Sequence, residues 1–329
     1  MSVTVAKTAG FCFGVRRAVD LAEQQAKKNG KIYAYGEIIH NMHEIERLEK
    51  LGVYTAYALE DIPDGAGVLI RAHGVPRNIY TLLQAKKCEI FDATCPFVRK
   101  IHKIVDKESA DGRLIVILGS AGHPEVVGIQ GWCGESVVLE GEEQARAFSE
   151  RPEMENKPIS LVAQTTVNRS IWNISVGLIK KRCTNLKIFD TICKATDERQ
   201  SEARLLAGVS DQMIVIGDKK SSNTKRLYEI SRSLCSDVRY IEDAAELTTQ
   251  ELGQHQHIGI TAGASTPAWI IKEVSNMMSE ETKIETGEDF AAMLEESFKT
   301  LNNGEKVTGT VVGISNNDVQ VLSLIHISE

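Results

Sequence analysis

Three cysteines in similar surroundings are the residues of this sequence best suited to chemistry. Cys12 lies in the stretch GFCFGV, while Cys95 and Cys193 end two near copies of one segment, IFDATC and IFDTIC. The chain has no C-x-x-C pair, so the zinc-ribbon and thioredoxin-like patterns lack their usual support. The remaining four cysteines lack this setting, and we interpret them as small buried side chains: Cys88, Cys133, Cys183 and Cys235.

Polar residues follow these three cysteines at repeated intervals. His40, His123 and Ser221 each lie 28 residues after one of the cysteines. A second polar residue comes 61, 70 and 72 residues after the same cysteines, at His73, Thr165 and Ser265. The repetition predicts three copies of one structural unit, which we place at residues 1–94, 95–192 and 193–280.

Short apolar runs alternate with amphipathic helical stretches along these units. The apolar runs are continuous, as in parallel strands covered on both faces, and we expect strands at 2–8, 31–36, 67–72, 88–93, 114–119, 160–164, 186–191, 212–217 and 257–262. Helices fall between them, for instance at 15–28 and 196–207. The pattern predicts an α/β fold of three units around a pseudo-threefold axis, with mainly parallel sheets. Because ligands gather at the carboxyl ends of parallel strands, we expect the repeated residues to meet at the centre.

Three converging thiolates would bind either zinc or an iron–sulfur cluster. Structural zinc takes four protein ligands, and catalytic zinc prefers some imidazole. A 4Fe–4S cluster on three cysteines leaves one iron without a protein ligand, and soft thiolates favour such clusters. The stretch HNMHE at 40–44 is the best support for the alternative, a zinc-dependent hydrolase or lyase, although it is not the H-E-x-x-H motif.

Uncharged polar side chains and histidines surround the expected position of the cysteines. This set is rich in hydrogen-bond donors and poor in lysine and arginine, which suits a phosphate or diphosphate held by directed bonds near helix N-termini. Its members are His40, His73, His123, Thr165, Ser221, Ser222, Asn223 and Ser265.

Glu125, in the stretch GHPEV, is the only carboxylate beside these polar positions. Near an anionic ligand and a pocket of low polarity its pKa should be raised, so that it can donate a proton. Thr165 would relay that proton. The alternative is a surface glutamate at the start of a helix, where the helix dipole favours a negative charge.

The stretches that carry these residues resemble the LytB/IspH family, the 4-hydroxy-3-methylbut-2-enyl diphosphate reductases. The resemblance runs from residue 2 to about residue 280 and rests on GFCFGVRRAV, EIIHN, RAHGVP, DATCPFV, GHPEV, QTT, DTICKAT, SSNT and GAS. It implies a trefoil of three α/β units around a 4Fe–4S cluster, with one open iron, held by Cys12, Cys95 and Cys193. The implied reaction is a two-electron, two-proton reductive dehydroxylation that yields isopentenyl and dimethylallyl diphosphates, the last step of the methylerythritol phosphate isoprenoid pathway.

The same resemblance assigns roles to the polar residues. The diphosphate would be held by His40, His73, Ser221, Ser222, Asn223 and Ser265. The substrate hydroxyl would be surrounded by the residues expected to be catalytic, Glu125, Thr165 and His123. Protons would come from Glu125 through Thr165, and electrons one at a time from ferredoxin or flavodoxin.

The chain departs from the family pattern after residue 280. Residues 281–306 predict an acidic helical linker with one apolar face. Residues 307–329 begin with two alternating strands around an N-N-D turn and resemble the first hairpin of the OB-fold RNA-binding modules of the large ribosomal small-subunit protein, which some clostridial-type reductases carry. The stretch is a truncated start of such a module, too short to close a five-stranded barrel, so we do not expect this chain to bind RNA.

Composition bears on compartment and partners. Hydrophobic residues make up 42% and charged residues 25% of the 329 residues, as in an ordinary globular protein. The net charge of −7 argues against a binding module that serves translation through its C-terminal segment. No apolar run approaches the roughly 18–20 residues of a membrane span, and the N-terminus lacks the pattern of a signal peptide. We therefore expect a cytoplasmic monomer without membrane contact, whose cysteines are reduced or bound to metal.

Overall fold

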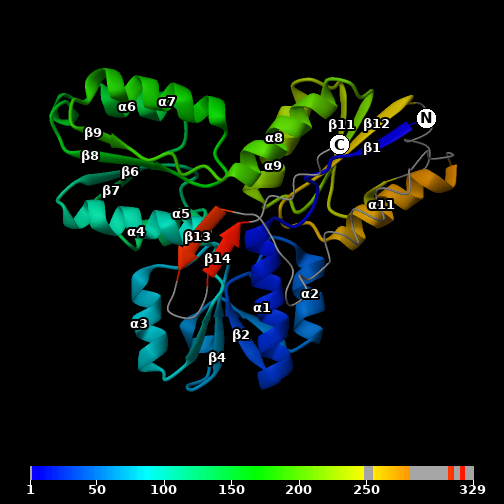
Figure 1. Ribbon diagram of the computed structural model, residues 1–329, viewed down its shortest axis with the longest axis horizontal. Coiled ribbons are helices and arrows are strands. Elements are labelled where there is room, and N and C mark those ends of the chain that lie inside the picture. The colour runs from blue at the N-terminus through cyan, green and yellow to red at the C-terminus, as the bar shows by residue number, and fades with distance from the viewer. Residues whose placement is uncertain (1, 248–254, 282–309, 315–318, 323–329) are drawn as a thin grey trace. The chain divides into compact units, whose positions relative to one another are not determined.

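The computed structural model describes residues 2–247, 255–281, 310–314 and 319–322. The chain divides into two units, Met1–Ile284 and Glu285–Glu329. Within the larger unit the described residues form three four-stranded sheets, and Figure 1 shows them as three lobes around a common centre. This arrangement confirms the predicted trefoil of α/β units.

The three sheets share one strand order. The first consists of β2 (Ile32–Tyr35), β3 (Val53–Ala56), β4 (Gly67–Ile70) and β5 (Glu89–Asp92), in the order β3-β2-β4-β5. The second consists of β6 (Leu114–Leu118), β7 (Ser136–Leu139), β8 (Ile159–Ala163) and β9 (Leu186–Ile188), in the order β7-β6-β8-β9. The third consists of β10 (Gln212–Ile216), β11 (Asp237–Ile241), β12 (His257–Ala262) and β1 (Ser2–Val5), in the order β11-β10-β12-β1. All of these pairings are parallel, as predicted.

The N-terminal strand belongs to the third sheet, which corrects the predicted first unit of residues 1–94. Ser2–Val5 of β1 pair in register with His257–Ile260 of β12. The backbone N–H of Ala6 extends this pairing by donating to the carbonyl of Ile260 at 2.8 Å. In each sheet the strand at the edge opposite β3, β7 or β11 leads into a repeated cysteine: β5 precedes Cys95, β9 precedes Cys193 and β1 precedes Cys12. Because the units form a ring, the first strand closes it by covering an edge of β12 that would otherwise be unpaired.

Helices cover both faces of each sheet, which explains why the strand cores are continuously apolar. The first sheet packs against α1 (Phe13–Asn29) and α2 (Met42–Lys50) on one face and α3 (Arg77–Ala85) on the other. The second packs against α4 (Pro96–Ala110) and α5 (Pro124–Gln130), and on its other face α6 (Glu142–Ser149) and α7 (Arg169–Arg182). The third packs against α8 (Lys194–Ala207) and α9 (Ser222–Arg232), and on its other face α11 (Ala268–Glu281).

All the strands predicted from continuous apolar runs are present, with ends that differ by up to three residues. The sequence pattern missed β3, β7 and β11, which are the outer edge strands of the three sheets. Their residues are mostly half-buried and include polar side chains, for example in SVVL of β7 and DVRYI of β11. β1, β5 and β9 lie at the opposite edges of the sheets and were found because each leads into a repeated cysteine loop, whereas no such motif marks the strands that were missed.

The smaller unit contains a β-hairpin. In it β13 (Thr310–Ile314) and β14 (Val319–Leu322) pair in antiparallel fashion, with a shift of register between Val311 and Gly313. These two strands confirm the predicted hairpin at 307–321. Of the predicted acidic linker at 281–306, residue 281 ends α11 and the rest lies outside the described residues. The OB-fold module at 307–329 stays a prediction.

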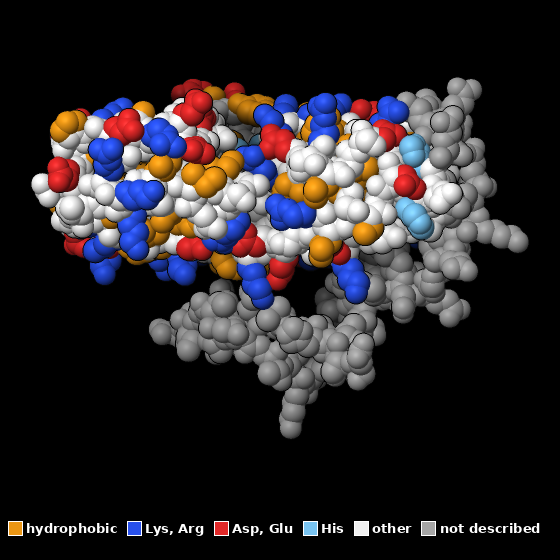
Figure 2. Space-filling view, turned by 90° about the horizontal axis from the view of Figure 1, so that it is seen from above, with side chains coloured by type: hydrophobic (Ala, Val, Ile, Leu, Met, Phe, Trp, Pro, Cys, Tyr) orange, Lys and Arg blue, Asp and Glu red, His pale blue; other side chains and the backbone are white. Residues whose placement is uncertain are grey.

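The surface carries charges of both signs. Figure 2 shows lysine and arginine side chains intermixed with aspartate and glutamate over the visible face, without a continuous basic area among the described residues there. In the part of the chain that the structure describes, no helix has the length and apolar character needed to cross a membrane.

Deleting residues 2–5 should loosen the third sheet selectively, because β12 would lose its partner along one edge. We expect amide hydrogen exchange in β12 to accelerate by at least about tenfold, and the melting temperature to fall by several degrees. Hydrogen–deuterium exchange read by mass spectrometry checks this, with β4 in the first sheet as the internal control. Unchanged protection of β12 would contradict the pairing of β1 with that strand.

Candidate functional site

The three repeated cysteines occupy equivalent positions in the fold. Cys12, Cys95 and Cys193 are the N-caps of α1, α4 and α8, and none of them uses its side chain to cap its helix. The backbone N–H of each donates at 3.0–3.1 Å to a carbonyl two residues beyond a strand of the sheet before it, with Ala264, Ala72 and Thr165 as the acceptors. The positive ends of three helices therefore point toward the same place as three thiols that are free to bind.

Gly14 shows how closely the thiols approach one another. A Cβ atom at this position would lie 2.6 Å from the Sγ of Cys95 and 4.0 Å from that of Cys12. Burial, and next the neighbouring Cys12, raises the pKa of the Cys95 thiol to about 12. Burial likewise raises the pKa of Cys193. Thiols in such a setting lose their protons only when a cation or a metal centre takes the place of those protons.

One cavity unites the thiols with the polar residues. Part of its wall is apolar and includes Val15, Ile39, Ala72, Phe97 and Val98. Every residue that the sequence singled out for the site lines this cavity: Cys12, His40, His73, Cys95, His123, Glu125, Thr165, Cys193, Ser221, Ser222, Asn223 and Ser265. The tertiary structure thus brings together residues from all three lobes.

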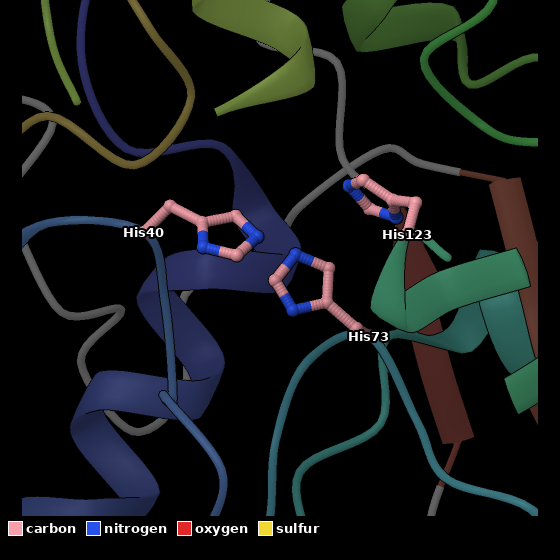
Figure 3. Close-up of side chains that lie close together, drawn as sticks. All are labelled: His40, His73 and His123. Carbon is pink, nitrogen blue, oxygen red and sulfur yellow. The ribbon is translucent and has the colours of Figure 1, made fainter. Parts of the chain in front are cut away.

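Three histidines form one side of the cavity (Figure 3). His40 follows β2, His73 follows β4, and His123 is the N-cap of α5. Their ring centroids are 4.7 Å apart for His40 and His73, 5.5 Å for His73 and His123, and 5.9 Å for His40 and His123. One ring nitrogen from each lies within 4.8 Å of those of the other two. The rings therefore face a common point, as a tetrahedral anion or a metal ion would require.

The surroundings of these rings set their charge and tautomers. Burial, and then the neighbouring histidines, lower the pKa of His73 well below its usual value. Burial, and next His40, lower that of His123 to about 4. His123 accepts the backbone N–H of Glu125 at Nδ1, at 3.1 Å, so its neutral ring carries the proton on Nε2. In the free protein His73 and His123 are therefore neutral, and Nε2 of His123 is a hydrogen-bond donor.

Several polar atoms of the cavity are buried without partners in the described part of the chain. They are Nε2 of His40, Nδ1 of His73 and both amide atoms of Asn223. The Nδ1 atom of His40 lies 3.1 Å from a carboxylate oxygen of Glu37, which can only accept, so that nitrogen carries a proton. Burying polar atoms without hydrogen bonds is unfavourable, so these atoms mark the place of a polar ligand.

The remaining polar residues lie around the N-terminus of α9. Ser221 caps this helix by accepting the N–H of Thr224 at 3.3 Å. The hydroxyl of Ser222 lies 3.1 Å from that of Thr166, and the hydroxyl of Ser265 donates to the carbonyl of His40 at 2.9 Å. A helix N-terminus with hydroxyl groups beside it is an anion-binding arrangement.

Glu125 and Thr165 form a buried pair beside the histidines. Glu125 is only 2% exposed, and its two carboxylate oxygens accept the backbone N–H and the hydroxyl of Thr165, each at 2.7 Å. Burial raises the pKa of Glu125 to about 7, although the two bonds from Thr165 oppose that rise. A carboxyl group that is half protonated near neutral pH can both donate and accept a proton, which bears out the sequence argument that its pKa is raised.

Sequence reasoning missed Arg199 of α8. Among the described residues that line the cavity it is the single arginine or lysine. Its signal in the sequence is weak, because KATDERQ reads as the exposed, charged start of a helix. Only the packing of α8 against the Cys12 loop shows that this side chain is buried.

The zinc alternative finds no support in the HNMHE stretch. Nε2 of His43 lies 3.0 Å from the carboxylate of Asp243, so this ring interacts with an aspartate and not with a ligand of His40. The second histidine of the stretch therefore does not join His40 as a ligand of one metal ion.

Comparisons with known proteins agree with this fold and site. The family model described as LytB protein matches residues 3–279. A protein of Clostridioides difficile (strain 630) named 4-hydroxy-3-methylbut-2-enyl diphosphate reductase is 43% identical over 83% of this chain and 98% of its own length. The protein of that name from Aquifex aeolicus (strain VF5) is 39% identical over 85% of this chain and 96% of its own length.

Two solved structures and a longer relative extend the comparison. A structure titled as (E)-4-hydroxy-3-methyl-but-2-enyl diphosphate reductase, the terminal enzyme of the non-mevalonate pathway, matches with 40% identity and a TM-score of 0.64 over 85% of this chain and 99% of its own. The Plasmodium falciparum E-1-hydroxy-2-methyl-but-2-enyl-4-diphosphate reductase matches with 27% identity and a TM-score of 0.79 over 90% and 99%. A reductase of Clostridium acetobutylicum is 40% identical over 96% of this chain, which spans 50% of that relative.

The fold and cavity define a three-lobed α/β protein with a central thiol site. The chain belongs to the LytB family. Its relatives are named as reductases, and a zinc-dependent hydrolase or lyase is not supported.

Replacing Glu125 by Gln should stabilise the protein in a pH-dependent way. The pKa of Glu125 rises from 4.5 to about 7 on folding, so its contribution to stability is present below the lower value and is lost as the pH rises through the higher one. The variant escapes this loss, and its advantage should grow from about pH 5 to pH 8 and reach about 3 kcal/mol. Urea unfolding at several pH values measures it.

Glu108 provides the matched control, since it is also buried but is held by a cation. Burial would raise the pKa of Glu108, but its bonds to Lys187 and Ser160 lower it. The substitution Glu108→Gln should therefore destabilise the protein at neutral pH. A Glu125→Gln variant whose stability follows that of the wild type at every pH would contradict the raised pKa.

Proposed function

We propose that this chain is a 4-hydroxy-3-methylbut-2-enyl diphosphate reductase, an oxidoreductase that forms isopentenyl and dimethylallyl diphosphates in the last step of the methylerythritol phosphate pathway. The observation that carries the proposal is the single cavity that holds three uncapped thiols, a group of anion-binding side chains and a buried carboxyl group. The names of the relatives and of the solved structures support it.

Cys12, Cys95 and Cys193 would hold a 4Fe–4S cluster. The residues fit this group because the three donors are soft, lie at three helix N-termini, and leave their thiols free of capping bonds. Gly14 fits it as well, since any side chain there would displace Cys95 from the centre. When bound, the cluster supplies electrons and one iron without a protein ligand that can act as a Lewis acid.

The diphosphate end of the substrate would lie among the histidines and the start of α9. The protein would hold it with His40, His73, Ser221, Ser222, Asn223 and Ser265. The unpaired polar atoms of His40, His73 and Asn223 gain partners when an anion enters. The apolar wall at Val15, Ile39 and Phe97 suits the short hydrocarbon part of such a substrate.

Glu125, Thr165 and His123 would deliver protons to the substrate hydroxyl. When Glu125 is protonated on the oxygen that faces Thr165, its O–H donates to the Thr165 hydroxyl, which in turn donates toward the substrate oxygen. His123 holds the start of α5 by accepting the N–H of Glu125, and its Nε2–H points a second donor at the cavity. Two electrons and two protons then release the hydroxyl as water.

The partners follow from the same chemistry. Ferredoxin or flavodoxin would supply the two electrons one at a time, and the substrate is a small diphosphate. We place the protein in the cytoplasm, in accord with its free cysteines, and we expect it to act as a monomer.

The first test is the metal content. Protein purified without oxygen should be brown and contain about four iron atoms per chain, as a 4Fe–4S cluster requires. Cys95→Ser should lose the colour and most of the iron, whereas Cys88→Ser, at a cysteine outside the cavity, should keep both. A colourless protein with one zinc ion would overturn the proposal.

The second test is proton delivery. Glu125→Gln should keep the iron and lose about 10²–10⁴-fold in kcat, because Gln cannot donate an acidic proton. Thr165→Val should lose less, since its backbone N–H still binds Glu125. Anaerobic turnover with a chemical reductant measures both rates. Normal turnover by an iron-loaded Glu125→Gln protein would exclude Glu125 as the proton donor.

A further inference from the structure

Arg199 is a buried charge at the edge of the thiol site. Its side chain is 5% exposed and lines the cavity. Nη2 donates to the carbonyl of Gly10 at 2.6 Å, and Nη1 lies 3.4 Å from the carbonyl of Ala195. Gly10 precedes Cys12 by two residues and Ala195 follows Cys193 by two, so one guanidinium group joins the backbones beside two of the three thiols.

The charge of Arg199 has no carboxylate partner within ion-pair distance among the described residues. Two glutamates on the same helix are engaged elsewhere. Glu202 accepts the N–H groups of Lys7 and Thr8 at 2.7 and 2.9 Å, and Glu198 lies 3.5 Å from the ammonium group of Lys194. Burial lowers the pKa of Arg199, and the groups that oppose this most are Cys12 and Cys193 in their ionised form, ahead of the two glutamates.

A buried guanidinium stays charged and needs a negative group to balance it. The Nε atom of Arg199 is buried and has no hydrogen-bond partner in the described residues. The place where a negative charge can develop beside it is the thiol site itself.

We propose that Arg199 is a positioning residue of the metal centre that raises its reduction potential. The proposal rests on the proposed function, because it requires an iron–sulfur cluster on the three cysteines. Each electron taken up adds a negative charge to the cluster, and a buried cation beside two of its ligands stabilises that added charge. Net charge, hydrogen bonds and solvent exposure are the factors that set the potentials of such clusters. The two backbone bonds also hold the Cys12 and Cys193 loops at a constant separation.

Arg17 forms a similar bridge at the next junction of the ring and provides a control. From α1 it donates to the carbonyl of Asp92, the last residue of β5, at 3.2 Å and to that of Thr94, next to Cys95, at 3.3 Å. It is only half-buried and is not among the residues that line the cavity. Its loss therefore removes a comparable pair of backbone bonds while changing the charge at the thiol site much less.

The test is a redox titration of the iron-loaded protein, followed by electron paramagnetic resonance. Arg199→Gln should lower the equilibrium constant for one-electron reduction by about tenfold, which is a shift of about 59 mV to more negative potential. Arg199→Lys keeps the charge and should stay close to the wild type. Arg17→Gln should also stay close to the wild type.

The outcomes separate the two proposals. Wild-type protein that binds no iron under anaerobic conditions overturns both the proposed function and the role of Arg199. Iron-loaded Arg199→Gln with an unchanged potential overturns the role of Arg199 alone. So does an Arg199→Lys variant that shifts as far as the Gln variant, because the bond geometry and not the charge would then matter.

A further variant decides the question if Arg199→Gln does not retain iron. Arg199→His carries a charge only at low pH, so its potential should fall more steeply with rising pH than that of the wild type. Equal slopes in the two proteins would overturn the proposal.

Discussion

Three backbone hydrogen bonds hold the centre of this protein together. In each of them a repeated cysteine at a helix N-terminus donates its N–H to a carbonyl two residues beyond a strand of the neighbouring sheet. The bond fixes where the helix begins, and thereby directs both its thiol and its positive end at the cavity. The same strand ends carry or adjoin the second set of polar residues, His73, Thr165 and Ser265. Ligand donors and substrate contacts are thus placed by one repeated interaction.

The cavity combines groups whose charges depend on one another. Burial keeps the thiol of Cys95 and the imidazoles of His73 and His123 neutral in the free protein and raises the pKa of Glu125 to about 7. Arg199 remains the one fixed cation of its described lining. Such a site favours ligands that bring negative charge, since each would supply the hydrogen-bond acceptors and the counter-charge that the buried groups lack. A metal centre on the thiols and a diphosphate by the histidines meet these requirements.

Much of the fold was predictable from patterns that are local or repeated. Continuous apolar runs located the buried strands, and the shared interval from each cysteine to His40, His123 and Ser221 revealed the three units. The edge strands β3, β7 and β11 were missed because they contain polar side chains and no repeated motif marks them, unlike the opposite edge strands β1, β5 and β9, which lead into the cysteine loops. The N-terminal strand was assigned to the wrong sheet, because nothing in a local pattern shows that Ser2–Val5 pair with a strand more than two hundred residues away.

The sequence by itself indicated which cysteines, histidines and hydroxyl groups belong to one site, because their repetition at equal or similar intervals is visible without coordinates. It also established the family, through short stretches that surround those residues. Only the tertiary structure decided the protonation of the site and the place of Arg199. Both depend on burial and on distances between lobes, as when α8 carries a guanidinium to the carbonyl of Gly10. Desolvation and charge pairing arise from what surrounds a residue in space, and no order of residues along the chain states that.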